Sequence, residues 1–83
     1  MHRITSVEAL SEYRIRVVFA DGTEGVIDLA DIVGSGVFKA LSDPSEFAKA
    51  FVDPITRTVA WPGGIDLCPD TLYRDIAAQQ KAA

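Results

Sequence analysis

The sequence has 83 residues, of which 48% are hydrophobic and 24% charged, and its formal net charge is −4. This composition is that of a folded protein, and the length fits a single domain spanning residues 1–83. The net negative charge, with basic residues scattered from Arg3 to Lys81, disfavours direct nucleic-acid binding. The sequence has no long apolar run and no signal-peptide core, which predicts a cytoplasmic protein without a membrane partner.

The first part of the chain has the pattern of β-strands. Residues 3–10 indicate a first strand, and Ser11-Glu12 a turn. In residues 13–19, apolar side chains occupy every second position, as in a half-buried strand. Residues 20–22 contain Asp21-Gly22, and residues 23–29 again resemble a strand, so we expect a β-hairpin.

The buried face of this hairpin selects its register. A two-residue loop would place Ile15 opposite Asp28 and bring carboxylates onto the apolar face. A three-residue loop places Ile15 opposite Ile27 and requires a left-handed conformation at Gly22. The sequence therefore predicts the three-residue loop, with Phe19 facing Thr23 and Arg14 facing Asp28.

Short elements fill the rest of the chain. We expect a helical turn near residues 30–33, a break at Gly34-Ser35-Gly36 and a helix over residues 44–49 that begins with Asp43 as N-cap and Pro44 at its first position. Strands are expected over residues 50–52 and 58–61, an extended piece over 65–67, and a last helix from Cys68-Pro69 onward. The predicted fold class is α+β, a mainly antiparallel sheet with short helices packed on one side.

Three blocks resemble one bacterial family. They are Val-Val-Phe-Ala-Asp-Gly-Thr-Glu-Gly-Val-Ile-Asp-Leu at 17–29, the segment 36–47 with Gly-Val-Phe-Lys-Ala-Leu and Asp-Pro-Ser-Glu-Phe, and Thr-Val-Ala-Trp-Pro-Gly-Gly-Ile-Asp-Leu-Cys-Pro-Asp-Thr-Leu-Tyr at 58–73. In this order they are similar to the family called domain of unknown function 2442.

The resemblance implies a fold and a gene neighbourhood, but no catalytic activity. It implies an α+β domain related to the N-terminal part of a bacterial protein that also carries a helix-turn-helix. It also implies a gene that often lies beside one for a second small domain, which suggests a paired, regulatory or toxin–antitoxin-like role. The family has no assigned catalytic residues, so none are transferred to this sequence.

The reactive residues do not form a catalytic or metal-binding pattern in the sequence. His2 is the only histidine and is interpreted as a solvated terminal residue, because catalysis needs a positioned base. Cys68 is the only cysteine and is interpreted as a small, partly buried residue that caps the last helix. Asp66 and Asp70 could lie close together, but they supply too few oxygens for calcium. We predict no metal, no cofactor and no enzymatic activity.

The block from Trp61 to Asp66 is the candidate partner-binding site. Its residues are Trp61, Pro62, Gly63, Gly64 and Asp66. Tryptophan is frequent among residues that dominate the energy of protein interfaces. We expect the ring of Trp61 to be buried with one edge at the surface, and the following residues to prevent normal strand pairing. The alternative is a core tryptophan followed by a structural bulge.

The sequence thus predicts a non-enzymatic protein-interaction module. Its expected partner is another small protein encoded nearby, with a homodimer as a further option. One alternative is a regulatory domain that acts on nucleic acid only through a helix-turn-helix partner. Another is a small ligand-binding domain or enzyme.

Overall fold

The computed structural model describes residues 2–82 of the chain, and the side chains of residues 2–79. Its elements, in chain order, are β1 (Ile4–Ala9), η1 (Ser11–Tyr13), β2 (Arg14–Phe19), β3 (Glu24–Asp28), η2 (Gly36–Ser42), α1 (Pro44–Phe47), β4 (Phe51–Val52), β5 (Val59–Trp61), β6 (Ile65–Asp66) and α2 (Pro69–Ala82). Within the described residues, none of the helices has the length and apolar character needed to cross a membrane. The α+β class is confirmed, but two three-stranded antiparallel sheets, β1-β2-β3 and β4-β5-β6, take the place of one sheet.

The hairpin of β2 and β3 has the predicted register. Ile15 pairs with Ile27 and Arg14 with Asp28. The loop holds three residues, because the Phe19 amide donates to the Thr23 carbonyl at 2.7 Å. Gly22 adopts a φ of +90°, a region that side chains with a Cβ rarely occupy. The face of the hairpin that must be buried therefore determines both the register and the need for glycine in the loop.

Replacing this glycine gives a first test of the hairpin. Gly22→Val is expected to lower the free energy of unfolding by about 1–3 kcal/mol, because a β-branched residue resists positive φ. An added Cβ would meet no atom within 4 Å, so the loss would come from the backbone alone. Gly34→Val is the matched control, since Gly34 also has open space but no positive φ. Urea denaturation followed by circular dichroism measures both; equal losses in the two variants would contradict the prediction.

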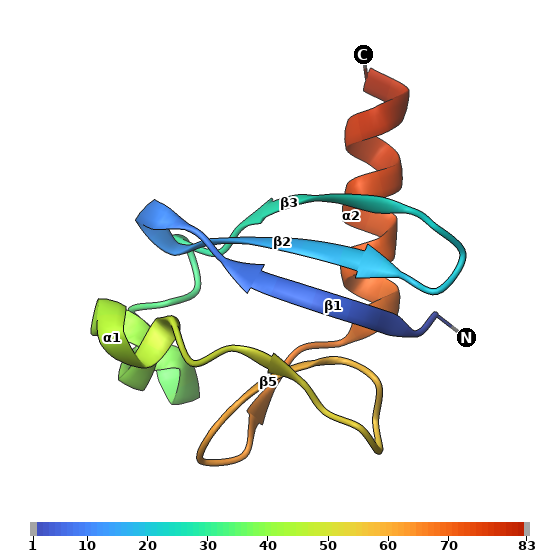
Figure 1. Ribbon diagram of the computed structural model, residues 1–83. Helices are drawn as coiled ribbons and strands as arrows, with labels where there is room; N and C mark the ends of the chain where they lie inside the picture. The colour runs from blue at the N-terminus through green and yellow to red at the C-terminus, as the bar shows by residue number, and fades with distance from the viewer. Residues whose placement is uncertain (1, 83) are drawn as a thin grey trace.

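The first sheet has one buried and one open face. Ile15, Val17 and Phe19 of β2 face the core, and all three are buried. On the other face Glu8, Arg16 and Glu24 are exposed. This alternation of apolar and polar residues is typical of an antiparallel sheet that is covered on one side. Figure 1 shows α2 on one side of β1, β2 and β3, with α1 and β5 below them.

The second sheet corrects the expectation for the segment after Trp61. β5 pairs with β6 through a tight turn at residues 62–64, so that Trp61 faces Ile65 and Ala60 faces Asp66. Gly63 and Gly64 have φ values of +101° and +86°, which lets the chain reverse at once. The prediction that normal pairing fails here is wrong, because the glycines close a hairpin instead of interrupting a strand.

The two α-helices begin where the sequence predicts. Asp43 caps α1, and its Oδ1 accepts from the Ser45 amide at 2.9 Å. The helix ends at Phe47, before the predicted Lys49, and residues 48–49 form a turn. The helix α2 begins at Pro69, and its side chains Leu72 and Ile76 are buried on one stripe. The segment between the Gly34-Ser35-Gly36 break and α1, for which the sequence predicts no element, forms the 3₁₀ helix η2.

One apolar core joins both sheets and the helices. It holds Ile4, Ile15, Val17, Phe19, Ile27, Leu29, Val33, Leu41, Phe47, Val59, Trp61, Leu72 and Ile76. The core lies between the inner face of the first sheet and the elements that follow it, so that the loops between these elements are left to form the surface.

Candidate functional site

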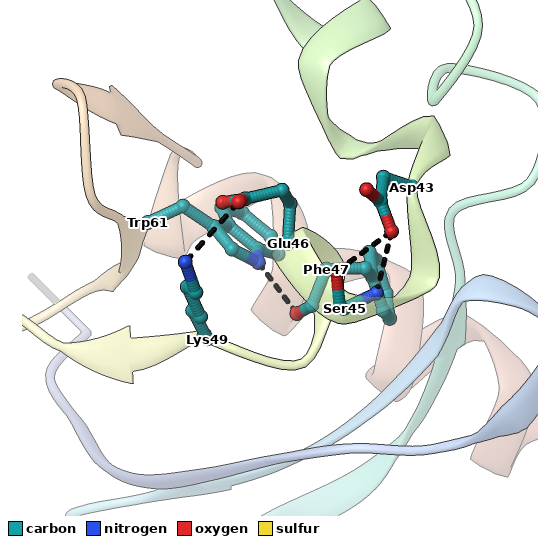
Figure 2. A network of polar contacts seen from close by, with 6 residues as sticks. All are labelled: Asp43, Ser45, Glu46, Phe47, Lys49 and Trp61. Atoms are coloured by element: carbon teal, nitrogen blue, oxygen red, sulfur yellow. Dashed lines mark hydrogen bonds and ion pairs between the residues drawn. The ribbon is translucent and has the colours of Figure 1, made fainter.

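Trp61 is part of the core and not of the surface. Its side chain is 1% exposed, and its indole Nε1 donates to the Phe47 carbonyl at 2.8 Å. The rings of Trp61 and Phe47 are 5.8 Å apart, centre to centre. The expected exposed ring edge is therefore wrong: the indole NH has a partner inside the protein, at the end of α1, as Figure 2 shows.

Polar contacts surround α1, the short helix whose last residue supplies this carbonyl. Asp43 Oδ1 accepts from both the amide and the hydroxyl of Ser45, at 2.9 and 2.8 Å. The bond from the Ser45 hydroxyl, followed by the bond from the Ser45 amide, lowers the pKa of the Asp43 carboxyl. Lys49 forms an ion pair with Glu46 at 3.1 Å. Figure 2 shows these contacts around the helix, together with the bond from Trp61 to its last carbonyl.

The remaining residues of the candidate block lie at the surface. Pro62, Gly63 and Gly64 form the exposed turn between β5 and β6, and Asp66 is exposed as well. They can present a carboxylate and backbone groups to a partner, but without an aromatic anchor. The candidate block thus consists of one core residue, Trp61, and a small exposed polar segment that follows it.

A second exposed loop lies at the opposite end of β5. Ile55 is 89% exposed in the connection from β4 to β5. The Asp53 carboxylate accepts from the amides of Ile55 and Thr56 at 2.8 and 3.2 Å, and the Arg57 carbonyl accepts from the Ile4 amide at 2.8 Å. The loop is ordered by these bonds, and it lies at the other end of β5 from the 62–64 turn.

His2 is stacked and not freely solvated as expected. Its ring lies parallel to that of Tyr73 with centres 3.7 Å apart, and its amide donates to Asp70 at 3.3 Å. The Tyr73 hydroxyl donates to Asp21 Oδ2 at 2.7 Å. This bond, followed by those from Thr23, lowers the pKa of Asp21. The contacts connect the start of the chain and the β2–β3 loop to the last helix.

Removing the tyrosine hydroxyl tests this connection. In Tyr73→Phe, the pKa of Asp21 is expected to rise toward its ordinary value, because its strongest hydrogen bond is lost. A carboxyl whose pKa is lowered by folding stabilises the fold above its unfolded pKa, and this contribution disappears as pH falls through the folded pKa. The stability difference between wild type and Tyr73→Phe should therefore shrink in acid. Carboxyl ¹³C NMR titration measures the shift, with Asp43 as internal control; an unchanged Asp21 pKa would contradict the assignment.

Cys68 is exposed, not partly buried as expected. It lies directly before α2, and its carbonyl accepts from the Leu72 amide at 3.2 Å. The Thr71 amide, then the Thr71 hydroxyl, lower the pKa of the Cys68 thiol. The chain has no second cysteine, so no disulfide partner exists within it. No group of three or more His, Cys, Asp or Glu residues that could hold a metal ion lies in the described part of the chain.

The hollow beside Cys68 was not expected from the sequence. It has a volume of about 310 Å³ and lies between the end of β3, the turn after it and α2. Five apolar residues form its floor: Ile27, Leu29, Ile32, Leu67 and Leu72. We call this hollow the α2 groove. Its residues come from two segments about forty positions apart, so no local motif in the sequence indicates it.

The rim of the α2 groove is polar and acidic. It consists of Asp28, Asp31, Cys68, Thr71 and Asp75. All five are exposed. Asp28 uses one oxygen to accept from the Ala30 amide at 2.8 Å. The lining residues include three carboxylates and no Lys, Arg or His.

The comparison with known families matches nearly the whole chain. The model of the family described as "Protein of unknown function (DUF2442)" covers residues 4–78. This chain belongs to the DUF2442 family. No curated protein is significantly similar to it.

A solved structure shares the fold of this DUF2442 chain. It is that of "Putative DNA Binding Protein NE0471 from Nitrosomonas europaea ATCC 19718", with 28% sequence identity and a TM-score of 0.68. The match covers 76% of this chain but 41% of the other, so this chain spans less than half the length of that protein. The family resemblance read from the three sequence blocks is confirmed.

Proposed function

We propose that the chain is a non-enzymatic protein-interaction module of the bacterial cytoplasm, one half of a regulatory or toxin–antitoxin-like pair. The observation that carries the proposal is the α2 groove, a hollow within a ring of polar side chains. Its apolar floor is partly open to solvent at Ile32 and Leu67, whereas Ile27, Leu29 and Leu72 below them are buried. Apolar surface that is left open and rimmed by polar groups is typical of sites that bind another molecule. Covering this floor by a partner would remove apolar area from water and so favour association.

The partner that we propose is the small protein encoded beside this chain. The test is isothermal titration of the purified chain with that protein at micromolar concentrations. We expect a saturable complex, and absence of binding at these concentrations would refute the paired role. Light scattering of the chain alone tests the remaining option, a homodimer, which would give twice the monomer mass without any partner.

Two variants separate the candidate surfaces within such a complex. Asp75→Arg changes the rim of the α2 groove, and Asp66→Ala changes the turn after Trp61; both residues are exposed. Each is expected to alter the free energy of unfolding by less than about 1 kcal/mol. Weaker binding of Asp75→Arg alone would support the groove as the interface. Weaker binding of Asp66→Ala alone would support the turn that the sequence pointed to.

A second candidate function is regulation of nucleic acid through an attached or bound helix-turn-helix. It is favoured by the structural similarity of this chain to part of a protein that is named "Putative DNA Binding Protein". The match covers 41% of that protein. The chain itself carries a net charge of −4, which opposes contact with phosphates. Fluorescence anisotropy with a random DNA duplex at about 150 mM salt is expected to show no binding by the isolated chain. Micromolar affinity would show direct DNA contact instead.

A further inference from the structure

We propose that the α2 groove binds a linear segment of the partner that presents an apolar side chain flanked by lysine or arginine. This inference rests on the proposed function and adds the chemistry of the bound segment. The groove has an apolar floor that includes Leu67 and Leu72 and a volume of about 310 Å³, which accommodates one or two side chains of a peptide.

The charges on the rim identify the flanking residues of the segment. The carboxylates of Asp31 and Asp75 make no hydrogen bond or ion pair with any side chain or backbone group that the structure describes. Asp28 has one oxygen engaged by the Ala30 amide. Elsewhere, by contrast, glutamates pair with cations, as Glu24 does with Arg16 at 2.6 Å and Glu46 with Lys49 at 3.1 Å.

Three carboxylates around an apolar floor produce a negative potential that no cation of the groove offsets. A hollow lined by one sign of charge, with apolar walls, attracts ligands of the opposite sign. Complementary charge selects partners and raises association rates, while the apolar contact supplies affinity. An acidic or neutral segment would leave the rim uncompensated, so the groove discriminates against it.

Cys68 provides a built-in reporter for this site. It lines the groove, it is exposed, and it is the only cysteine of the chain. A segment seated in the groove covers the thiol and slows its alkylation by iodoacetamide. At a peptide concentration about ten times the Kd, the rate should fall by about tenfold, in proportion to the free fraction.

The experiment is selection of peptides from a random display library on the immobilised full chain, followed by alkylation of Cys68 with each synthetic peptide present. We expect enriched peptides to carry an apolar residue next to lysine or arginine and to slow the alkylation. Enrichment of neutral or acidic peptides, no enrichment, or binding without protection of Cys68 would overturn the proposal. Equal protection by spermidine, which has positive charge but no apolar side chain, would also overturn it, because charge alone would then suffice.

A matched pair of variants tests the rim directly. Asp31→Asn/Asp75→Asn removes two charges from the groove, and Glu8→Gln/Glu12→Gln removes two exposed charges outside it. The first is expected to weaken the selected peptides by about three- to tenfold, and the second to leave their Kd unchanged. Equal effects in both variants would contradict recognition by the rim.

Failure of this inference is distinguishable from failure of the proposed function. If the neighbouring protein binds but neither protects Cys68 nor responds to Asp31→Asn/Asp75→Asn, the interaction module stands and the groove assignment falls. If basic apolar peptides protect Cys68 while the neighbouring protein does not bind, the groove chemistry stands and the pairing falls.

Discussion

Trp61→Ala is expected to lower the free energy of unfolding by about 3–5 kcal/mol, the usual loss when a large aromatic side chain is removed from a core. The ring is 1% exposed, and its indole donates to the Phe47 carbonyl at 2.8 Å. At roughly 0.05–0.15 kcal/mol per residue, a domain of this size has a total stability of about 4–12 kcal/mol. The variant should therefore be strongly destabilised and, near the lower limit, unfolded.

The measurement is urea denaturation followed by far-ultraviolet circular dichroism, since the chain has no second tryptophan to report by fluorescence. Trp61→Phe separates the two contributions, because it keeps an aromatic ring and removes the indole donor. It should cost about 1–3 kcal/mol, because it removes the indole hydrogen bond and leaves part of the space of the larger ring unfilled, while the Phe47 carbonyl still accepts from the Ala50 amide at 3.3 Å. A loss below about 1 kcal/mol in Trp61→Ala would show that the ring is not a core residue.

This tryptophan also shows where prediction from the sequence succeeded and failed. The alternation of Val59 and Trp61 indicated a strand, which is confirmed, but the degree of burial depends on Phe47, fourteen positions away. The hairpin register followed from the sequence because both strands and their loop are contiguous, and one slip would invert their faces. Local caps such as Asp43 were predictable for the same reason.

Features that join distant segments were not predictable in this way. His2 stacks on Tyr73, and the α2 groove joins the end of β3 to α2. Nothing near His2 or Asp31 in the chain indicates these neighbours, because they are set by how α2 crosses the first sheet. The position of Cys68 directly before the last helix could be inferred from Pro69. Its exposure to solvent could not, because it depends on where α2 lies relative to the rest of the fold.

The crossing of α2 over the first sheet depends on Gly25, and its substitution is expected to have the second large effect. A Cβ at Gly25 would lie 2.9 Å from Cγ2 and 3.1 Å from Cγ1 of Ile76. Ile76 is 1% exposed, so its side chain cannot move aside into solvent. Gly25→Ala is therefore expected to destabilise the protein by about 1–3 kcal/mol through overpacking.

The opposite change on the helix creates a gap at the same place. Ile76→Ala is expected to cost about 2–5 kcal/mol, from lost burial and the cavity that remains. In the double variant, the methyl group introduced by Gly25→Ala would occupy part of that cavity, because the isoleucine side chain with which it collides is gone. Gly25→Ala/Ile76→Ala should thus be at least as stable as Ile76→Ala alone, with a coupling energy of about 0.5–3 kcal/mol between the two sites.

The double-mutant cycle is measured by urea denaturation of the four proteins under one set of conditions. Gly34→Ala is the matched control, because a Cβ at Gly34 meets no atom within 4 Å and Gly34 has no positive φ. Gly34→Ala should change stability by less than about 0.5 kcal/mol and add independently to Ile76→Ala. If the effects of Gly25→Ala and Ile76→Ala also add without coupling, the close approach of β3 and α2 is wrong. In that case the α2 groove, whose walls are these two elements, would lose its structural basis.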